Sequence, residues 1–445
     1  MKKLTSNNEK NIILNILGAF FVKGGAAIIS VILLPLYISF FDNQTILGIW
    51  YTILSVLNWI NLFDLGLGNG LRNLLPECFE KKDRLSARKY ISTTYIAITI
   101  IAVCASCIGG ILVSVANWNT ILNVSERIIS KQQLTECVII VFWGVILHLV
   151  LKTITSILYA IQKSAWVNAL AMISNLIILL SLLIVPSFDL TTNLRNMAII
   201  NAFAINFPYL ICSIILFATV LKGCYPSVKF FEKKFIKNVL GIGLSLFWLT
   251  LVFMLLTSMN EFFISRFTSP DNVLYYQAYN KVFHTGAVVI SLALTPIWSA
   301  VTQAQAQKNY CWIKKIYKLF LYGTIGCVFI EIGIVPFLQL IMDIWLKKDA
   351  INVNYAHAVA FAILSTLMIL HNVNISIGNG LSYFKVQLIW MTVAAVFYIP
   401  LAYVLVGWLN SWIGIIWSAI ICLLPYEFIA PFCTMRMIDK KVADN

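Results

Sequence analysis

Residues 176–186 read LIILLSLLIVP, an apolar run interrupted by a single serine. A strand of a membrane barrel alternates apolar and polar residues, and this run does not alternate. Comparable runs recur from residue 11 almost to the end of the chain. About 20 apolar residues in a helix span a bilayer, and lipid offers backbone amides no partner outside a helix or a closed barrel. The sequence therefore predicts an all-α integral membrane protein.

Composition supports this fold class over the whole chain. Of 445 residues, 60% are hydrophobic and only 11% are charged, whereas soluble domains carry about 25% charged residues. This composition excludes a soluble enzyme. About twelve transmembrane helices are expected, at residues 11–40, 46–68, 90–117, 136–161, 165–186, 196–221, 239–265, 275–300, 316–341, 354–376, 386–408 and 411–433.

The positions of the basic residues explain the net charge of +14. With the N-terminus placed in the cytoplasm, 23 of the 32 Lys and Arg residues fall in inner segments and six in outer loops. This bias is the positive-inside rule, and it predicts that both chain ends are cytoplasmic. The surplus charge is thus expected to face anionic membrane lipids, and no nucleic-acid partner is expected.

Loop lengths divide the chain into two similar halves. Helices 4 and 5, like helices 10 and 11, are joined by tight turns that each carry one lysine, Lys163 and Lys385. We expect an N-terminal six-helix bundle at residues 1–221, a cytoplasmic linker at 222–238 and a C-terminal six-helix bundle with a short cytoplasmic tail at 239–445. Parallel repeats of this kind place a binding site at their interface.

Three basic residues and two histidines are predicted to form a cationic substrate-binding cavity. Lys23 lies near the middle of the first helix and is expected to face the cavity. The alternative is that this helix is tilted and places Lys23 at the inner membrane interface. His148 and Lys152 are four residues apart and share one face of the fourth helix, and the alternative is that the Lys152 side chain extends to the inner interface. Lys281 and His284 share a face of the eighth helix, in its outer third. The alternative is that their side chains extend to the membrane interface instead of lining a cavity.

Acidic residues in the predicted helices are candidates for balancing these lysines or for carrying a coupling ion. They are Asp64, Glu261, Glu331 and Glu427. Asp64 and Glu261 lie near helix ends, so that an ordinary solvated or capping role is equally open. Glu331, near the centre of the ninth helix, must be paired or protonated. If the lysines converge, the cavity is net positive and favours an anionic cargo such as a lipid-linked pyrophosphate.

Residues 50–73, WYTILSVLNWINLFDLGLGNGLRN, followed by ARKYIST at residues 87–93, resemble bacterial Wzx-type O-antigen flippases. That family belongs to the superfamily of MATE transporters and oligosaccharide exporters. The resemblance implies a MATE-like, V-shaped pair of bundles and a cationic cavity residue in the first helix, where Lys23 stands. The FDLGLGNGLRN segment is expected to be a flexible helix end, or gate, and it carries Gly66, Gly68, Asn69, Gly70 and Arg72.

The resemblance implies a transporter rather than an enzyme. The expected function is alternating-access flipping of undecaprenyl-pyrophosphate-linked oligosaccharides across the bacterial cytoplasmic (inner) membrane, for O-antigen, lipopolysaccharide or other surface polysaccharide biosynthesis. The expected partners are the lipid-linked oligosaccharide, a polysaccharide polymerase and a chain-length regulator.

No catalytic residue, metal or cofactor is expected, and coupling to an H⁺ or Na⁺ gradient or to the membrane potential is compatible with the sequence. Two alternatives remain open. One is an ion-coupled multidrug or cation exporter of the same superfamily, whose cavity should be acidic and aromatic. The other is a membrane polysaccharide polymerase, which should carry a large outer loop that is not evident here.

Overall fold

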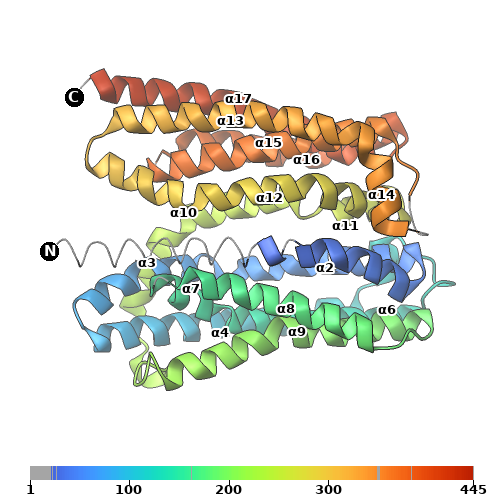
Figure 1. The fold of residues 1–445 in the computed structure, drawn as a ribbon. Helices are drawn as coiled ribbons and strands as arrows, with labels where there is room; N and C mark the ends of the chain where they lie inside the picture. Colours follow the sequence, from blue (N-terminus) through green and yellow to red (C-terminus); the bar gives the residue numbers. More distant parts are fainter. Residues whose placement is uncertain are drawn as a thin grey trace. The chain divides into compact units, whose positions relative to one another are not determined.

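The computed structural model describes residues 22, 24–26, 28–161, 163–347, 351–381 and 383–443. In this part of the chain, all regular structure is helical and there is no strand (Figure 1). The prediction of an all-α protein is confirmed. The chain divides into two compact units, Met1–Leu251 and Val252–Asn445.

The N-terminal unit begins with an apolar helix, Gly24–Phe41. Its further elements are α2 (Gln44–Asn58), η1 (Trp59–Asp64), α3 (Leu67–Glu80), α4 (Arg84–Val115), α5 (Trp118–Leu122), α6 (Lys131–Leu151), α7 (Thr153–Ala160), α8 (Ser164–Ile184), α9 (Leu190–Ala218), η2 (Val228–Phe230) and the first part of α10 (Lys233–Thr257). Helices α6 and α9 pack along each other, and α4 and α8 flank them (Figure 1).

The C-terminal unit begins within α10. It continues with α11 (Asn260–Phe267), α12 (Asp271–Ala306), α13 (Tyr310–Ile334), η3 (Val335–Phe337), α14 (Leu338–Leu346), α15 (Tyr355–Gly380), α16 (Lys385–Leu409) and α17 (Ile413–Ala443). Helix α15 packs against α12, α13 and α17, and α16 packs against α17. The fourth expected span of the N-terminal unit, which contains α6, lies against the sixth, α9. In the C-terminal unit, the fourth span, α15, likewise lies against the sixth, α17.

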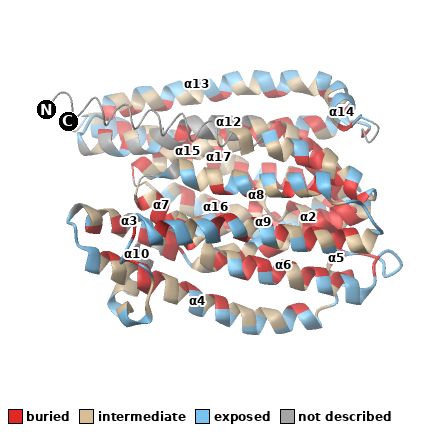
Figure 2. Ribbon diagram, turned by 60° about the horizontal axis from the view of Figure 1, so that its bottom comes forward, coloured by how far each residue is buried: buried red, intermediate tan, exposed pale blue. Residues whose placement is uncertain are grey.

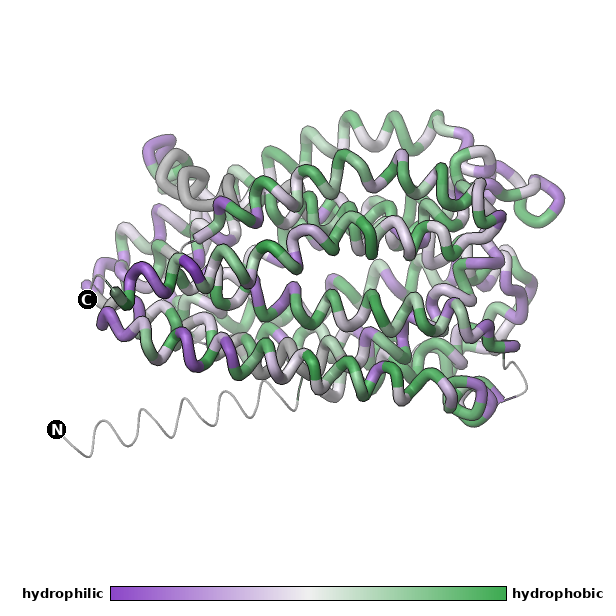
Figure 3. Tube along the Cα trace, turned by 90° about the horizontal axis from the view of Figure 1, so that it is seen from above, coloured by the Kyte–Doolittle hydropathy of each residue, from purple (hydrophilic) through white to green (hydrophobic). Residues whose placement is uncertain are grey.

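Large apolar side chains cover the outside of the helices as well as their contacts. Along α4, Ile108, Ile111 and Val115 are more than half exposed, and along α13 Phe329 is 71% exposed (Figure 2). Hydrophilic residues gather towards the helix ends (Figure 3). Exposed apolar surface on this scale is incompatible with water and suits lipid.

Nine helices in the described residues are long and apolar enough to cross a membrane. The pair Phe247–Thr257 and Asn260–Phe267, bent by 41°, forms a tenth if it counts as one span. The two other expected spans correspond to α2–η1–α3 and to α12.

Four of the helices predicted as continuous are broken, and the one expected at 239–265 is divided between α10 and α11. The one expected at 46–68 ends in η1, because Leu65 and Gly66 both adopt left-handed backbone conformations (φ 50° and 77°) before α3 begins. The one at 136–161 is interrupted at Lys152, and the one at 316–341 becomes a 3-10 turn at residues 335–337, where Pro336 has no N–H to donate.

The helix bounds expected at 46–68 and 90–117 leave a long basic connection between them, and most of this connection is helical in the structure. Helix α3 continues to Glu80 and α4 starts at Arg84, so only a tight turn joins them. Asp83 caps α4, because its carboxylate accepts from the Ser86 N–H at 3.0 Å. This hydrogen bond holds the pKa of the Asp83 carboxyl below its usual range. Of the basic residues here, Arg72, Arg84, Arg88 and Lys89 lie on helices, and Lys81 and Lys82 lie in the turn.

Gly144 provides a test of the α6–α9 contact. A Cβ at this position would lie 2.7 Å from the Cβ of Ala202 and 3.1 Å from its Cα. We expect Gly144→Ala to lower the free energy of unfolding by about 1–3 kcal/mol, because the two helix backbones cannot approach as closely. Thermal unfolding in detergent measures the effect. Gly323→Ala is the matched control, since nothing lies within 4 Å of a Cβ there; equal midpoints for the two variants would contradict the close contact.

Candidate functional site

Lys152 lies at the break between α6 and α7. Its backbone N–H donates to the carbonyl of His148 at 2.8 Å, and its own carbonyl accepts from the N–H and the hydroxyl of Thr155 at 2.9 and 2.8 Å. This tight turn interrupts the helix without leaving these backbone groups unpaired. The Lys152 side chain is half-buried. A cation is thus held inside the N-terminal unit at a point where the helix is irregular.

His148 lies one turn before Lys152, as its spacing predicted. Its ring packs edge-on against Tyr209 of α9, with the ring centroids 4.7 Å apart. The buried Nδ1 atom has no hydrogen-bond partner. A buried imidazole nitrogen without a partner, beside a lysine, is a polar position that the packing of the unit does not satisfy.

Asp64 combines a capping role with an electrostatic one. Its carboxylate accepts from the Gly66 N–H at 3.0 Å, at the start of α3. It also interacts electrostatically with the ammonium group of Lys152, which in turn interacts with His148. Asp64 is therefore an acidic neighbour of Lys152 within the N-terminal unit, although the two do not form an ion pair.

The glycine-rich segment allows this arrangement. A Cβ on Gly68 would lie 2.8 Å from the hydroxyl oxygen of Ser156 and 3.1 Å from a carboxylate oxygen of Asp64. Ser156 is one helical turn beyond Lys152, so α7 contacts the start of α3 on the face that carries the lysine. Gly66, Gly68 and Gly70 are buried, whereas Asn69 and Arg72 are exposed. The Arg72 guanidinium lies over the ring of Tyr159, 4.2 Å from its centroid.

The C-terminal unit contains a second lysine with an acidic neighbour. Lys281 of α12 interacts electrostatically with Glu261 of α11, and His284 interacts with Lys281. A Glu261 carboxylate oxygen accepts from the Gln277 amide at 2.8 Å. Lys281 is half-buried and His284 is exposed. Like Lys152, Lys281 has an acidic neighbour within its own unit.

Glu331 is buried where α12, α13 and α15 meet, with 3% of its surface exposed. The Ser365 hydroxyl oxygen lies 2.7 Å from one carboxylate oxygen of Glu331 and 2.9 Å from the Phe283 carbonyl oxygen. A serine hydroxyl has one proton and donates to only one of them. The other carboxylate oxygen of Glu331 has no partner. Both short contacts are satisfied at once when Glu331 carries a proton that it donates to Ser365.

Sequence reasoning named Glu427 but missed its partners, His371 and Asn374, with which it forms a deeply buried polar cluster. His371 of α15 lies with its Nδ1 atom 2.6 Å from one carboxylate oxygen of Glu427, and the Asn374 amide donates to the other at 2.8 Å. The side chains of His371 and Glu427 are 1% and 0% exposed. The Tyr317 hydroxyl donates to the side-chain amide oxygen of Asn374 at 2.8 Å, and the Phe253 ring stacks on the imidazole of His371. The spacing of three residues places His371 and Asn374 on one helix face, and this spacing was the sequence signal that could have indicated a polar cluster.

The predicted convergence of the cationic residues stays a prediction. Lys152 and His148 belong to the N-terminal unit, and Lys281 and His284 belong to the C-terminal unit. Lys23 lies outside the described residues.

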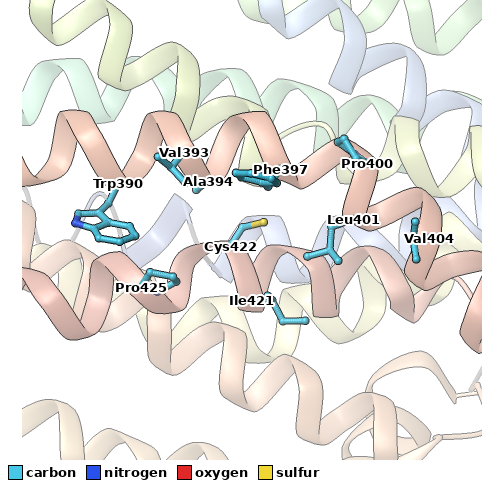
Figure 4. A pocket seen from close by; sticks show the side chains of 10 residues that line it. All are labelled: Trp390, Val393, Ala394, Phe397, Pro400, Leu401, Val404, Ile421, Cys422 and Pro425. Atoms are coloured by element: carbon cyan, nitrogen blue, oxygen red, sulfur yellow. The ribbon is translucent and has the colours of Figure 1, made fainter.

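An apolar groove occupies the surface of α16 and α17, with a volume of about 470 Å³ (Figure 4). It contains none of the predicted site residues. The lining residues are Trp390, Val393, Ala394, Phe397, Pro400, Leu401, Val404, Ile421, Cys422 and Pro425. Such a groove suits an acyl chain and has no group to bind a charge.

The His371–Glu427 pair generates a test that does not depend on function. We expect His371→Ala and Glu427→Gln each to lower thermal stability, and the double variant to lose less than the sum. A coupling free energy of about 0.5–3 kcal/mol is expected, because each single change leaves a buried partner unsatisfied. Strict additivity of the unfolding free energies would show that the pair is not formed.

Comparison with known proteins identifies the fold. A scan against protein-family models and a search of curated proteins gave no match. Among solved structures, an inward-facing multidrug resistance MATE family transporter of the MOP superfamily has a TM-score of 0.70 at 14% identity, covering 96% of this chain and 95% of that one. An outward-facing transporter of the same description has a TM-score of 0.63 at 13% identity, covering 97% of both chains.

A third solved structure is a MOP superfamily transporter from Pyrococcus furiosus, described as having a binding pocket of reverse polarity that suggests a different function. Its TM-score is 0.66 at 14% identity, and the match covers 96% of both chains. This chain therefore has the fold of MATE family transporters and is a multi-pass membrane protein.

Proposed function

We propose that the protein is a flippase for undecaprenyl-pyrophosphate-linked oligosaccharides in the bacterial cytoplasmic membrane. The observation that carries this proposal is Lys152, a half-buried cation at a helix break in the N-terminal unit. A charge inside a membrane helix is costly, and retaining one indicates a ligand that uses it. The flipped repeat unit would serve O-antigen or another surface polysaccharide.

Lysine suits a pyrophosphate because its ammonium is a compact charge with three donors. His148, with its unpaired Nδ1, adds a neighbouring polar group. In the absence of cargo, Asp64 offsets the charge of Lys152. The arriving pyrophosphate then replaces one counter-charge by another, which lowers the cost of leaving the lysine in an apolar surrounding.

The sugars are expected to cross a hydrated lumen while the polyprenyl tail stays in lipid. Solved structures of this fold include transporters described as inward-facing and outward-facing. These states support alternating access as the mechanism. The reverse pocket polarity described for the Pyrococcus furiosus protein supports the idea that this fold accommodates cargoes of different charge.

Coupling to protons fits the buried acids better than coupling to Na⁺. One carboxylate oxygen of Glu427 is hydrogen-bonded to the His371 imidazole and the other accepts from the Asn374 amide, so these oxygens do not form an oxygen cage for a metal ion. Glu331 satisfies its contacts best with a proton bound. Expected partners in the membrane are the lipid-linked oligosaccharide, a polysaccharide polymerase and a chain-length regulator.

An ion-coupled multidrug or cation exporter is the second candidate. The MATE transporters of the same fold favour it, as do the buried acids of the C-terminal unit, Glu331 and Glu427. The lysines in both units argue against a cationic cargo. Efflux of a cationic dye that depends on Glu427 would favour the exporter.

Transport by a Lys152 variant tests the flippase proposal. We expect Lys152→Ala to slow the flipping of a lipid-linked oligosaccharide in reconstituted vesicles by about tenfold or more, because a charge-assisted contact to the pyrophosphate is lost. Lys152→Arg should retain part of the activity, since it keeps the charge. The control is Lys81→Ala, which removes an exposed lysine paired with Glu77. Equal rates for Lys152→Ala and the unmodified protein would remove Lys152 from the site.

A further inference from the structure

The ARKYIST motif at residues 87–93 lies in the first turns of α4 and takes no part in the sites above. Five of its seven residues contact a single segment elsewhere in the chain, residues 225–235. This segment contains η2 and the first residues of α10. It is also the connection through which the chain leaves the six helices of the N-terminal unit.

Two hydroxyl groups of the motif bind backbone amides of the segment. Ser92 accepts from the Ser227 N–H and Thr93 accepts from the Glu232 N–H, both at 3.1 Å. The side chains of Ser92 and Thr93 are buried, at 0% and 1% exposure. Buried hydroxyls that each receive a backbone N–H of an irregular segment fix its path along α4.

The charged residues of the motif bind the segment from the other side. The Arg88 guanidinium lies over the rings of Tyr225 and Phe230, 4.3 and 4.0 Å from their centroids, and it donates to the Tyr225 carbonyl at 3.3 Å. The Lys89 ammonium lies 2.6 Å from a Glu232 carboxylate oxygen. Arg88 suits this position because its planar group stacks on rings while its N–H groups still donate.

Tyr90 completes the contact at the start of α10. Its ring packs edge-on against Phe235, with the ring centroids 4.3 Å apart. Each of these interactions contributes little by itself, since exposed ion pairs and single hydrogen bonds are each worth about 1 kcal/mol or less. Five residues of one motif that all contact the same short segment are a different case, because the entropy cost of ordering that segment is incurred only once for all the contacts.

We propose that the 87–93 motif is a clasp that holds residues 225–235 against the N-terminal unit. The connection to the C-terminal unit is then not a free linker, although its basic composition suggested one. Its first part moves with α4. The chain passes between the two compact units inside α10, between Leu251 and Val252.

This clasp has a consequence for transport, which rests on the proposed function. If the two units move relative to each other during alternating access, the joint lies in α10 beyond Phe235 rather than in the cytoplasmic segment. The clasp residues are therefore positioning residues and bind no cargo.

Hydrogen exchange of the full-length protein in detergent or nanodiscs tests the clasp. Peptides covering residues 225–235 should exchange slowly in the unmodified protein. In the Ser92→Ala/Thr93→Val variant, we expect exchange at Ser227 and Glu232 to accelerate about fivefold or more, because both amides lose their acceptors. Thr99→Val is the matched control, since the Thr99 hydroxyl bonds only within α4, to the Tyr95 carbonyl. Fast exchange in the unmodified protein, or no change in the variant, would overturn the proposal.

A charge exchange keeps the test informative if the first variant folds poorly. Lys89→Glu should also accelerate exchange in this segment, and Lys89→Glu with Glu232→Lys should restore protection because the pair is re-formed with reversed signs. Failure of the double variant to recover would contradict the clasp. Flipping assays on the same proteins separate the two proposals: an unmodified protein with a protected segment but no flipping would refute the function and leave the clasp intact.

Discussion

In the hydrocarbon core of a bilayer, no water binds a backbone amide or a charged side chain, and the whole structure depends on this constraint. It makes every described element helical, since only a helix pairs its own N–H and C=O groups. It also requires that each charge within the membrane find a partner in the protein. Lys152 interacts with Asp64, Lys281 with Glu261, and Glu427 with His371.

Irregular backbone and polar side chains occur together for the same reason. The break at Leu65–Gly66 lies beside Gly68, which Asp64 and Ser156 approach, and the break at Lys152 lies one helical turn before Ser156. A broken helix has backbone N–H and C=O groups without a partner in the helix, and it leaves space beside them. Polar side chains nearby pair with these groups and fill the space. Both units contain a buried imidazole with one nitrogen that has no partner, His148 Nδ1 in the N-terminal unit and His371 Nε2 in the C-terminal unit. In the C-terminal unit, the other nitrogen of His371 lies against Glu427.

The sequence predicted the fold class because hydropathy reports the bilayer directly. It also placed His148 and Lys152 on one face, since helical spacing is fixed. It did not predict the breaks at Leu65 and Lys152, because hydropathy does not register a change of backbone conformation within an apolar run. It missed His371, because only tertiary packing shows that this residue meets Glu427 from another helix. The role of ARKYIST was out of reach for the same reason, since its partners lie about 140 residues away in sequence.

Equilibrium binding to the purified protein tests most directly whether the cargo is anionic. Native mass spectrometry with undecaprenyl pyrophosphate and with uncharged undecaprenol separates binding of the pyrophosphate from binding of the tail. We expect the pyrophosphate to bind about tenfold or more tightly than the alcohol, and this preference to disappear in Lys152→Ala. Equal binding of the two lipids, or an unchanged preference in the variant, would contradict an anionic cargo held by Lys152.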